Sequence, residues 1–215
     1  MSHELDPIET GTTLDAESQV AADEDRKGCE LIDGEWVPKD REESPREIDR
    51  KGYELIDGNW IEKPMSKAAA IVGSNLHGRL FNHIRPNRSG LLMIGDAAYR
   101  LPNSNNNRVR KPDLSFVVAG RVTPTRDEDG SWPIGPDLAV EVISPNEMAE
   151  AVETKLDEYL RAGVRLVWVL YIPTRNVWAY KLDGTARLYR ATDTLPGEDV
   201  LPGFAVSVAE LFEGV

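Results

Sequence analysis

The sequence predicts an α/β fold in which a mixed β-sheet is flanked by helices. Two short β-branched runs, 138–143 and 165–172, have the composition of buried strands. Two longer stretches, 66–84 and 146–162, carry apolar residues at helical spacing. At 215 residues the chain is long enough for one such domain with its own core, together with an N-terminal extension.

The N-terminal part of the chain contains an internal repeat. Residues 1–24 are acidic and short of large apolar groups, a composition that predicts a disordered tail. The segment DRKGCELIDGEWVPK at 25–39 recurs as DRKGYELIDGNWIEK at 49–63, each copy with an Asp-Gly turn between two strand-like runs. We therefore expect a β-hairpin extension, and we divide the chain into the tail, a duplicated hairpin segment (25–48) and a main domain (49–215).

The main domain is expected to begin with a helix and two strands. The helix covers 66–84 with Ser66 as its N-cap, and the strands cover 91–101 and 114–118. A long loop after the second strand carries Trp132, which we expect to be exposed. The C-terminal part is expected to add strands over 165–172 and 176–181 and a short helix over 208–212.

A buried carboxylate is predicted in the strand that begins after Asp137. Glu141 lies in the middle of this β-branched run, where a carboxylate without compensation is costly. In the helix that follows, Lys155 lies three residues after Val152 and four before Tyr159, so it shares the inward face or its border. A carboxylate and an ammonium group are therefore both directed inward. This arrangement fits an active site or a buried ion pair.

A second carboxylate is predicted close to the first. Asp113 lies at the start of the strand over 114–118, where a carboxylate can stay partly hydrated. Two carboxylates at the ends of adjacent strands, with a lysine opposite, suit Mg²⁺-dependent chemistry on a phosphate. Carboxylate oxygens hold the cation, and the lysine steadies an attacking water and the developing charge.

Several phrases of the sequence resemble a known nuclease family. Pro112-Asp113 followed by Glu141-Val142-Ile143 is similar to the PD-(D/E)xK signature of restriction-endonuclease-like, metal-dependent nucleases. More narrowly, the chain resembles the Uma-type family of short bacterial endonucleases from about Gly52 to the C-terminus. The matching phrases are YELIDGNWIE, GDAAYRLPN, VRKPDLSFV, DLAVEVISP, KLDEYLRAGVRLVWVL and VLPGF.

This resemblance implies a restriction-endonuclease-like fold and hydrolysis of phosphodiester bonds in nucleic acid. Asp113, Glu141 and Lys155 would be catalytic, and the two carboxylates would also bind Mg²⁺ or Mn²⁺. The general signature has its lysine where this chain has Ile143, but in the Uma-type pattern the lysine comes from the following helix, as Lys155 does. The family also tends to carry an aspartate one turn before that lysine, where this chain has Ala151.

The negative charge of the chain is located mainly before the main domain. The formal net charge is −12, and residues 1–63 hold 19 acidic and 8 basic residues, against 18 and 17 in the remainder. Between residues 79 and 111 the only acid is Asp96, so this basic stretch is a candidate phosphate-binding surface or an ordinary solvated one. The candidate nucleic-acid-binding residues in it are Arg100, Arg108, Arg110 and Lys111.

The sequence predicts a cytoplasmic protein whose partner is nucleic acid, with DNA as the first candidate. A single cysteine, Cys29, excludes an internal disulfide, and no apolar run approaches the length of a membrane span. The oligomeric state stays open between a monomer and a homodimer.

Two functions are compatible with the sequence. The first is a metal-dependent endonuclease, and the second is a catalytically degenerate nuclease fold that serves as a nucleic-acid or protein-interaction module. Ala151 and the acidic tail favour the second reading. Glu54 could reach the site from the second hairpin, but its counterpart Glu30 in the first copy favours a structural role for it.

Overall fold

The structure is a computed structural model that describes most of the main domain and part of the N-terminal extension. The described residues are 29–32, 35–38, 53–56, 58–62, 66–102, 108–122, 130–145 and 147–215. They belong to two compact units, Met1–Asp49 and Arg50–Val215. The predicted disordered tail lies outside the described residues.

The two copies of the repeat form the same hairpin, one in each unit. In the first unit β1 (Cys29–Ile32) pairs antiparallel with β2 (Glu35–Pro38). In the second, β3 (Tyr53–Ile56) pairs with β4 (Asn59–Glu62) in the equivalent register. Gly58 in the second turn has a φ of 83°, a conformation that glycine adopts without steric cost. The hairpins predicted from the sequence are confirmed.

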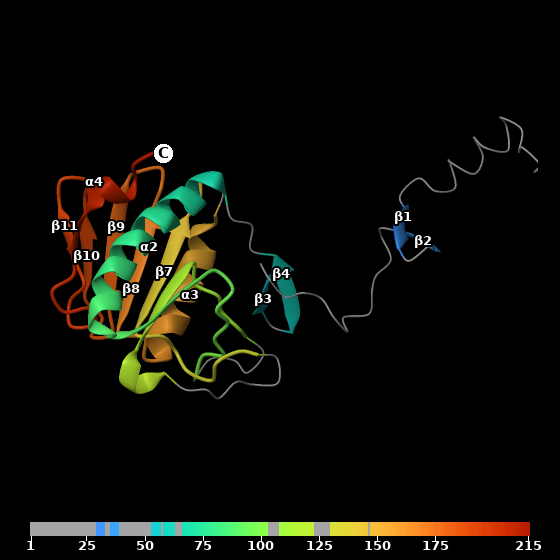
Figure 1. Ribbon diagram of the computed structural model, residues 1–215, viewed down its shortest axis with the longest axis horizontal. Coiled ribbons are helices and arrows are strands. Elements are labelled where there is room, and N and C mark those ends of the chain that lie inside the picture. The colour runs from blue at the N-terminus through green and yellow to red at the C-terminus, as the bar shows by residue number, and fades with distance from the viewer. Residues whose placement is uncertain are drawn as a thin grey trace, which may run out of the picture. The chain divides into compact units, whose positions relative to one another are not determined.

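The main domain is built on a six-stranded mixed sheet (Figure 1). The strand order is β10-β9-β8-β7-β6-β5, and every neighbouring pair is antiparallel except β7 and β8, which are parallel. The strands are β5 (Gly90–Ile94), β6 (Leu114–Val118), β7 (Leu138–Ile143), β8 (Leu166–Tyr171), β9 (Asn176–Lys181) and β10 (Ala186–Tyr189). A parallel pair requires a crossover, and the helix between β7 and β8 provides it.

Helices cover both faces of this sheet (Figure 1). The helices are α2 (Lys67–Asn87), α3 (Ala149–Arg161) and the short α4 (Val208–Leu211), with a 3-10 turn η1 (Ala119–Arg121) and a small pair of strands, β11 (Thr194–Pro196) and β12 (Ala205–Ser207). Ser66 caps α2 as predicted, because its hydroxyl accepts the N–H of Ala69 at 3.1 Å. The mixed sheet with flanking helices confirms the predicted fold class.

The alternation of side chains along β7 sends its residues to two separate cores. Val140 and Val142 join the cluster that contains the buried face of α2, whereas Ala139 and Ile143 join the cluster that contains Val152 of α3. Since successive side chains of a strand point to opposite faces, Glu141 lies on the α3 face. The sheet thus presents its buried carboxylate to the helix that carries Lys155.

Two expectations about the middle of the chain were wrong. The strand expected over 91–101 ends at Ile94, because Gly95 takes a left-handed φ of 59° and turns the chain out of the sheet. Trp132 is buried, 5% exposed, and its ring packs edge-to-face against Tyr99 with centroids 5.8 Å apart. The loop residues around Trp132 therefore belong to the α3-side core and not to an exposed contact.

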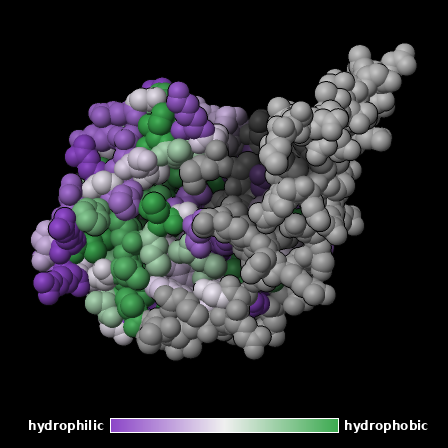
Figure 2. All heavy atoms as spheres, turned by 45° about the vertical axis from the view of Figure 1, so that its right-hand side comes forward, coloured by the Kyte–Doolittle hydropathy of each residue, from purple (hydrophilic) through white to green (hydrophobic). Residues whose placement is uncertain are grey.

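The outer strand β5 forms an apolar edge of the sheet. Its sequence GLLMI contains no charged residue, and Ile94 is 62% exposed. The face drawn in Figure 2 shows hydrophobic side chains gathered in a band among hydrophilic ones.

Within the described residues, no helix is long and apolar enough to cross a membrane.

Candidate active site

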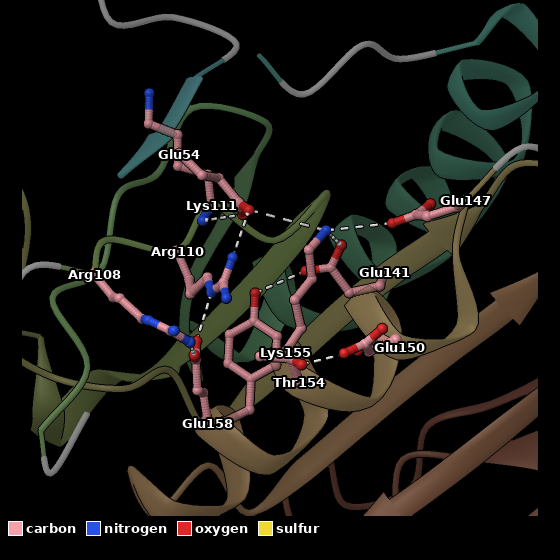
Figure 3. A network of polar contacts seen from close by, with 11 residues as sticks. Glu54, Arg108, Arg110, Lys111, Glu141, Glu147, Glu150, Thr154, Lys155 and Glu158 are labelled. Atoms are coloured by element: carbon pink, nitrogen blue, oxygen red, sulfur yellow. Dashed lines mark hydrogen bonds and ion pairs between the residues drawn. The ribbon is translucent and has the colours of Figure 1, made fainter. Parts of the chain in front are cut away.

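Glu141 and Lys155 meet between β7 and α3. Nζ of Lys155 lies 3.4 Å from Oε2 of Glu141 (Figure 3). The hydroxyl of Tyr159, one helical turn after the lysine, donates a hydrogen bond to Oε1 of the same carboxylate at 2.7 Å. All three side chains are buried, so each interaction is made out of contact with bulk water. The carboxylate that the sequence placed inside a strand thus has a cation on one oxygen and a neutral donor on the other.

Asp113 reaches the same end of the sheet from β6. The β6–β7 register pairs Leu114 with Val140, so the next pair along the ladder sets Asp113 opposite Glu141. Its backbone N–H donates to the carbonyl of Val140 at 2.9 Å, and its Oδ2 accepts the N–H of Val142 at 2.7 Å. Asp113 is more buried than the partly hydrated position expected from the sequence. Asp113 therefore lies beside Glu141 on the neighbouring strand.

Lys155 lies among three carboxylates. Besides Glu141, Oε1 of Glu147 is 3.4 Å from its ammonium nitrogen, and Oε2 of Glu54 is 4.0 Å away (Figure 3). Glu147 comes from the turn between β7 and α3, and Glu54 comes from the hairpin strand β3. The ammonium group is therefore anchored from three directions. It can leave one carboxylate without losing all of its compensation.

A buried ion-pair network fixes α3 against the hairpin. Arg110 donates from Nη1 to Glu54 at 3.0 Å and from Nε to Glu158 of α3 at 2.6 Å. Glu54 also accepts the backbone N–H of Lys111 at 3.0 Å, and Arg108 pairs with Glu158 (Figure 3). Buried charges persist when they are paired and hydrogen-bonded in this way. The network connects three segments that are distant in the sequence.

Burial and neighbouring charges shift the pKa values of two groups in this region. Burial acts to lower the pKa of Arg110, but its hydrogen bond to Glu158 and the charges of Glu54 and Glu158 outweigh burial and leave that pKa raised. Burial also raises the pKa of Tyr159 well above its ordinary value, and the charge of Glu141 raises it further. Tyr159 therefore keeps its proton and remains a hydrogen-bond donor.

The predicted nucleic-acid-binding residues do not form one exposed surface. Arg110 is 3% exposed and held by two glutamates, and Lys111 is buried with its ammonium 3.6 Å from Asp96. Arg108 is partly exposed, and its guanidinium pairs with Glu158. Arg110 and Lys111 thus depart from the solvated basic stretch expected from the sequence, because tertiary contacts bring acidic partners that the local sequence lacks. A contact of Arg100 or Arg108 with nucleic acid stays a prediction.

For Glu54 the sequence leaves open whether it reaches the site or has only a structural role. The contacts of Glu147, Glu158 and Tyr159 are not predicted from the sequence. For Tyr159 a signal was present, since it follows Lys155 by four residues and so lies on the same helical face.

The groups near Glu141 that could hold a metal ion are oxygens. In the part of the chain that the structure describes, no group of three His, Cys, Asp or Glu side chains is arranged to hold a metal. Mg²⁺, however, commonly uses one or two carboxylates and keeps several waters. Since the carbonyl of Val140 points to Asp113, the carbonyl of Val142 points to the same side and adds a third oxygen. Asp113, Glu141 and this carbonyl are the oxygens that could hold such an ion.

Two open cavities adjoin the candidate site. One, of about 290 Å³, is lined by Ile56, Arg108, Arg110, Met148, Glu150, Ala151, Thr154 and Lys155. The other, of about 390 Å³, contains Asp113 in its wall together with small residues of α2. Ala151 lines the first cavity, so its short side chain leaves open the space one turn before Lys155. Lys155 therefore borders the first cavity and Asp113 the second, and Glu141 lines neither of them.

Comparison with known proteins points to nucleases. The family model Uma2, described as "Putative restriction endonuclease", matches residues 38–209. A solved structure from Anabaena variabilis ATCC 29413, described as "a putative nuclease belonging to DUF820", superimposes with a TM-score of 0.63 and 20% sequence identity, covering 74% of this chain and 89% of that chain. No curated protein sequence matches the chain. The structural similarity supports the predicted fold class, a mixed sheet flanked by helices.

Proposed function

The chain belongs to the Uma2 family, and from this membership we propose that it is a metal-dependent endonuclease that hydrolyses phosphodiester bonds of nucleic acid. The observation that supports the proposal most is the contact of 3.4 Å between Lys155 and Glu141, next to Asp113 on the neighbouring strand. Carboxylates from two strands and a lysine from the next helix supply the groups that this reaction needs. We take DNA as the first substrate to test.

In this proposal Asp113, Glu141 and the carbonyl of Val142 hold Mg²⁺ or Mn²⁺. When bound, the cation supplies polarisation of a phosphate oxygen and of a nearby water. The carboxylates of Asp113 and Glu141 keep their positions because Asp113 is fixed by the Val142 N–H and Glu141 by the Tyr159 hydroxyl. These hydrogen bonds fix the ligand oxygens before the cation arrives.

Lys155 has two roles in the proposal. Without a cation it balances the charge of Glu141, and during hydrolysis its N–H groups orient the attacking water and offset the charge that develops on the phosphate. The water oxygen forms the new bond to phosphorus, and the bond from phosphorus to one ester oxygen breaks. Glu147 and Glu54 would keep the ammonium group at the site if a cation took its place at Oε2 of Glu141.

The second candidate function is a nuclease fold without catalysis, used as a nucleic-acid or protein-interaction module. Ala151 favours it, because it leaves the wall of the cavity beside Lys155 without the aspartate that the family tends to carry there. The two functions share the fold and the buried residues. They differ in whether a divalent cation binds and whether nucleic acid is cleaved.

Calorimetric titration with Mg²⁺ and Mn²⁺, together with cleavage assays on single- and double-stranded DNA and RNA, separates the two functions. We expect the wild-type chain to bind the cation and cleave at least one substrate, and Asp113→Asn and Glu141→Gln to lose both properties. Glu150→Gln is the matched control, because Glu150 is an exposed carboxylate of the neighbouring cavity outside the donor set. Nucleic-acid binding that is independent of metal and equal in all variants, without cleavage, would establish the interaction module.

A further inference from the structure

The fully buried hydroxyl of Tyr159 donates a hydrogen bond to the carboxylate of Glu141. The donor–acceptor distance is 2.7 Å, and Tyr159 and Glu141 are 0% and 2% exposed. We propose that Tyr159 is a positioning residue for Glu141: its hydroxyl holds Oε1 and thereby presents Oε2 to the divalent cation. This inference rests on the proposed function, in which Glu141 is a metal ligand.

The two groups that donate to Glu141 differ in how readily a cation could displace them. Lys155 contacts Oε2 through a flexible side chain that also reaches Glu147 and Glu54. If a cation were held at Oε2, the ammonium group of Lys155 could move toward the carboxylates that already surround it. Tyr159 contacts Oε1 through a rigid ring without any charge to be repelled by the cation. The hydrogen bond from Tyr159 would thus be the one to persist with a cation bound.

The position of the Tyr159 ring is itself fixed by its surroundings. The ring belongs to the cluster on the α3 side of the sheet, with Val167 and Val169 of β8. The preceding residue, Glu158, is anchored by Arg108 and Arg110, so the helical turn that carries the tyrosine is held by buried ion pairs. A hydroxyl on a rigid, anchored element limits the orientations of Glu141 more strongly than a mobile side chain would.

Residues that orient a metal ligand affect the affinity for the metal more directly than the chemical step. Loss of such a partner typically costs about 10- to 100-fold in metal affinity. Tyr159→Phe removes the hydroxyl and keeps the ring that fills the core. We expect its Kd for Mg²⁺, measured by calorimetry, to rise about 10- to 100-fold. The cleavage rate at saturating Mg²⁺ should return to within a few-fold of the wild-type rate.

Tyr99→Phe is the matched control for this substitution. Tyr99 is also fully buried, and its hydroxyl lies 2.8 Å from its partner, but that partner is the neutral Ser115 hydroxyl. Both variants lose one buried tyrosine hydroxyl, and only Tyr159→Phe loses a contact to the proposed metal ligand. We therefore expect Tyr99→Phe to bind Mg²⁺ like the wild-type chain, with thermal melts recorded for both.

If Tyr159→Phe does not melt cooperatively, Lys155→Ala provides the second measurement. It removes the other donor from Glu141, and retained Mg²⁺ affinity there supports orientation by Tyr159. A 10-fold or greater loss of Mg²⁺ affinity in Lys155→Ala overturns the inference that Tyr159 orients Glu141. This threshold is about the lower end of the loss expected for an orienting partner.

The titration of Glu141→Gln distinguishes failure of the inference from failure of the proposed function. Wild-type Mg²⁺ affinity in Glu141→Gln overturns the assignment of Glu141 as a ligand and the inference with it. Loss of affinity in Glu141→Gln together with wild-type affinity in Tyr159→Phe overturns the inference alone.

Discussion

The free-energy cost of burying Glu141 is offset by its immediate neighbours. It lies in a strand whose six residues are all buried, where an ionised carboxylate without partners would be strongly disfavoured. Lys155 supplies the opposite charge and Tyr159 supplies a hydrogen bond to the other oxygen. The site therefore keeps a carboxylate in the interior at the expense of placing a lysine and a tyrosine hydroxyl there as well.

Replacement of Lys155 is predicted to separate metal binding from catalysis. Lys155→Ala should leave Mg²⁺ bound, because the proposed oxygen ligands remain, and should slow cleavage about 10²–10³-fold, the effect of removing one preorganised donor. Single-turnover rates at saturating Mg²⁺ measure this loss. Lys181→Ala is the control, since Lys181 pairs with Glu198 and neither residue belongs to the proposed site. A wild-type rate in Lys155→Ala would remove the lysine from the mechanism.

Removal of Arg110 is predicted to destabilise the fold. Arg110→Met leaves Glu54 and Glu158 without the guanidinium they share, and breaking a buried ion pair in this way typically costs about 3–5 kcal/mol. Urea denaturation measures the free energy of unfolding. Arg161→Met is the comparison, because the Arg161–Asp157 pair is exposed and is expected to contribute less than about 1 kcal/mol. Equal losses in the two variants would show that the buried network contributes little.

Individual residues differ in how far the sequence could predict their surroundings. The inward directions of Glu141 and Lys155 follow from strand alternation and helical spacing, which are local properties. The contacts of Glu54 with Arg110 and Lys111 join residues that are 56 and 57 positions apart, and they depend on where the hairpin packs. The burial of Arg110 could not be predicted for the same reason, since its acidic partners come from distant segments.

At the scale of elements, the close approach of β5 and β6 depends on a glycine. A Cβ added to Gly90 would overlap the carbonyl oxygen of Val117 and the ring of Phe116. The backbone of β5 can therefore pair with β6 at this point only because residue 90 has no side chain. Gly78, on the exposed side of α2, has nothing within 4 Å of the corresponding position.

Alanine at these two glycines is predicted to have opposite effects. Gly90→Ala should lower the free energy of unfolding by about 1–3 kcal/mol, the usual cost of overpacking. Gly78→Ala should raise it by about 0.5–1 kcal/mol, because alanine loses less backbone entropy than glycine in a helix. Chemical denaturation of both variants provides the test. Stabilisation by Gly90→Ala would contradict the tight β5–β6 contact.

Most elements could be predicted because their sequence patterns are strong and local. The strand over 176–181 has the bounds expected, and α2 has the expected Ser66 cap. The strand expected over 91–101 was too long because an apolar pattern does not reveal that Gly95 turns left-handed. The burial of Trp132 depends on Tyr99, which meets it from another segment.

For the whole molecule, the N-terminal extension is predicted to be dispensable for folding of the main domain. A shortened chain that begins at Ile48 retains the compact unit Arg50–Val215 and every residue proposed for the site. We expect it to keep a cooperative thermal transition, followed by circular dichroism. Aggregation or loss of the transition would show that the duplicated hairpin belongs to the core.

A second shortened chain tests the hairpin that the main domain retains. A chain that begins at Ser66 lacks Glu54, so Arg110 loses one of its two carboxylates and Lys155 loses one of its three. We expect this chain to be less stable than the one that begins at Ile48. The two copies of the repeat, although nearly identical in sequence, should therefore differ in their importance for folding.

The hydrogen bond from the Val142 N–H to Asp113 has a spectroscopic consequence. It couples one amide of a central strand to a carboxylate proposed to bind the cation. Amides in buried strands exchange slowly with solvent, so the Val142 signal should remain observable by NMR after transfer to heavy water. Added Mg²⁺ should shift this resonance in the wild-type chain and leave it unmoved in Glu141→Gln. Cation occupancy can then be followed on a single peak, before any nucleic-acid substrate has been identified.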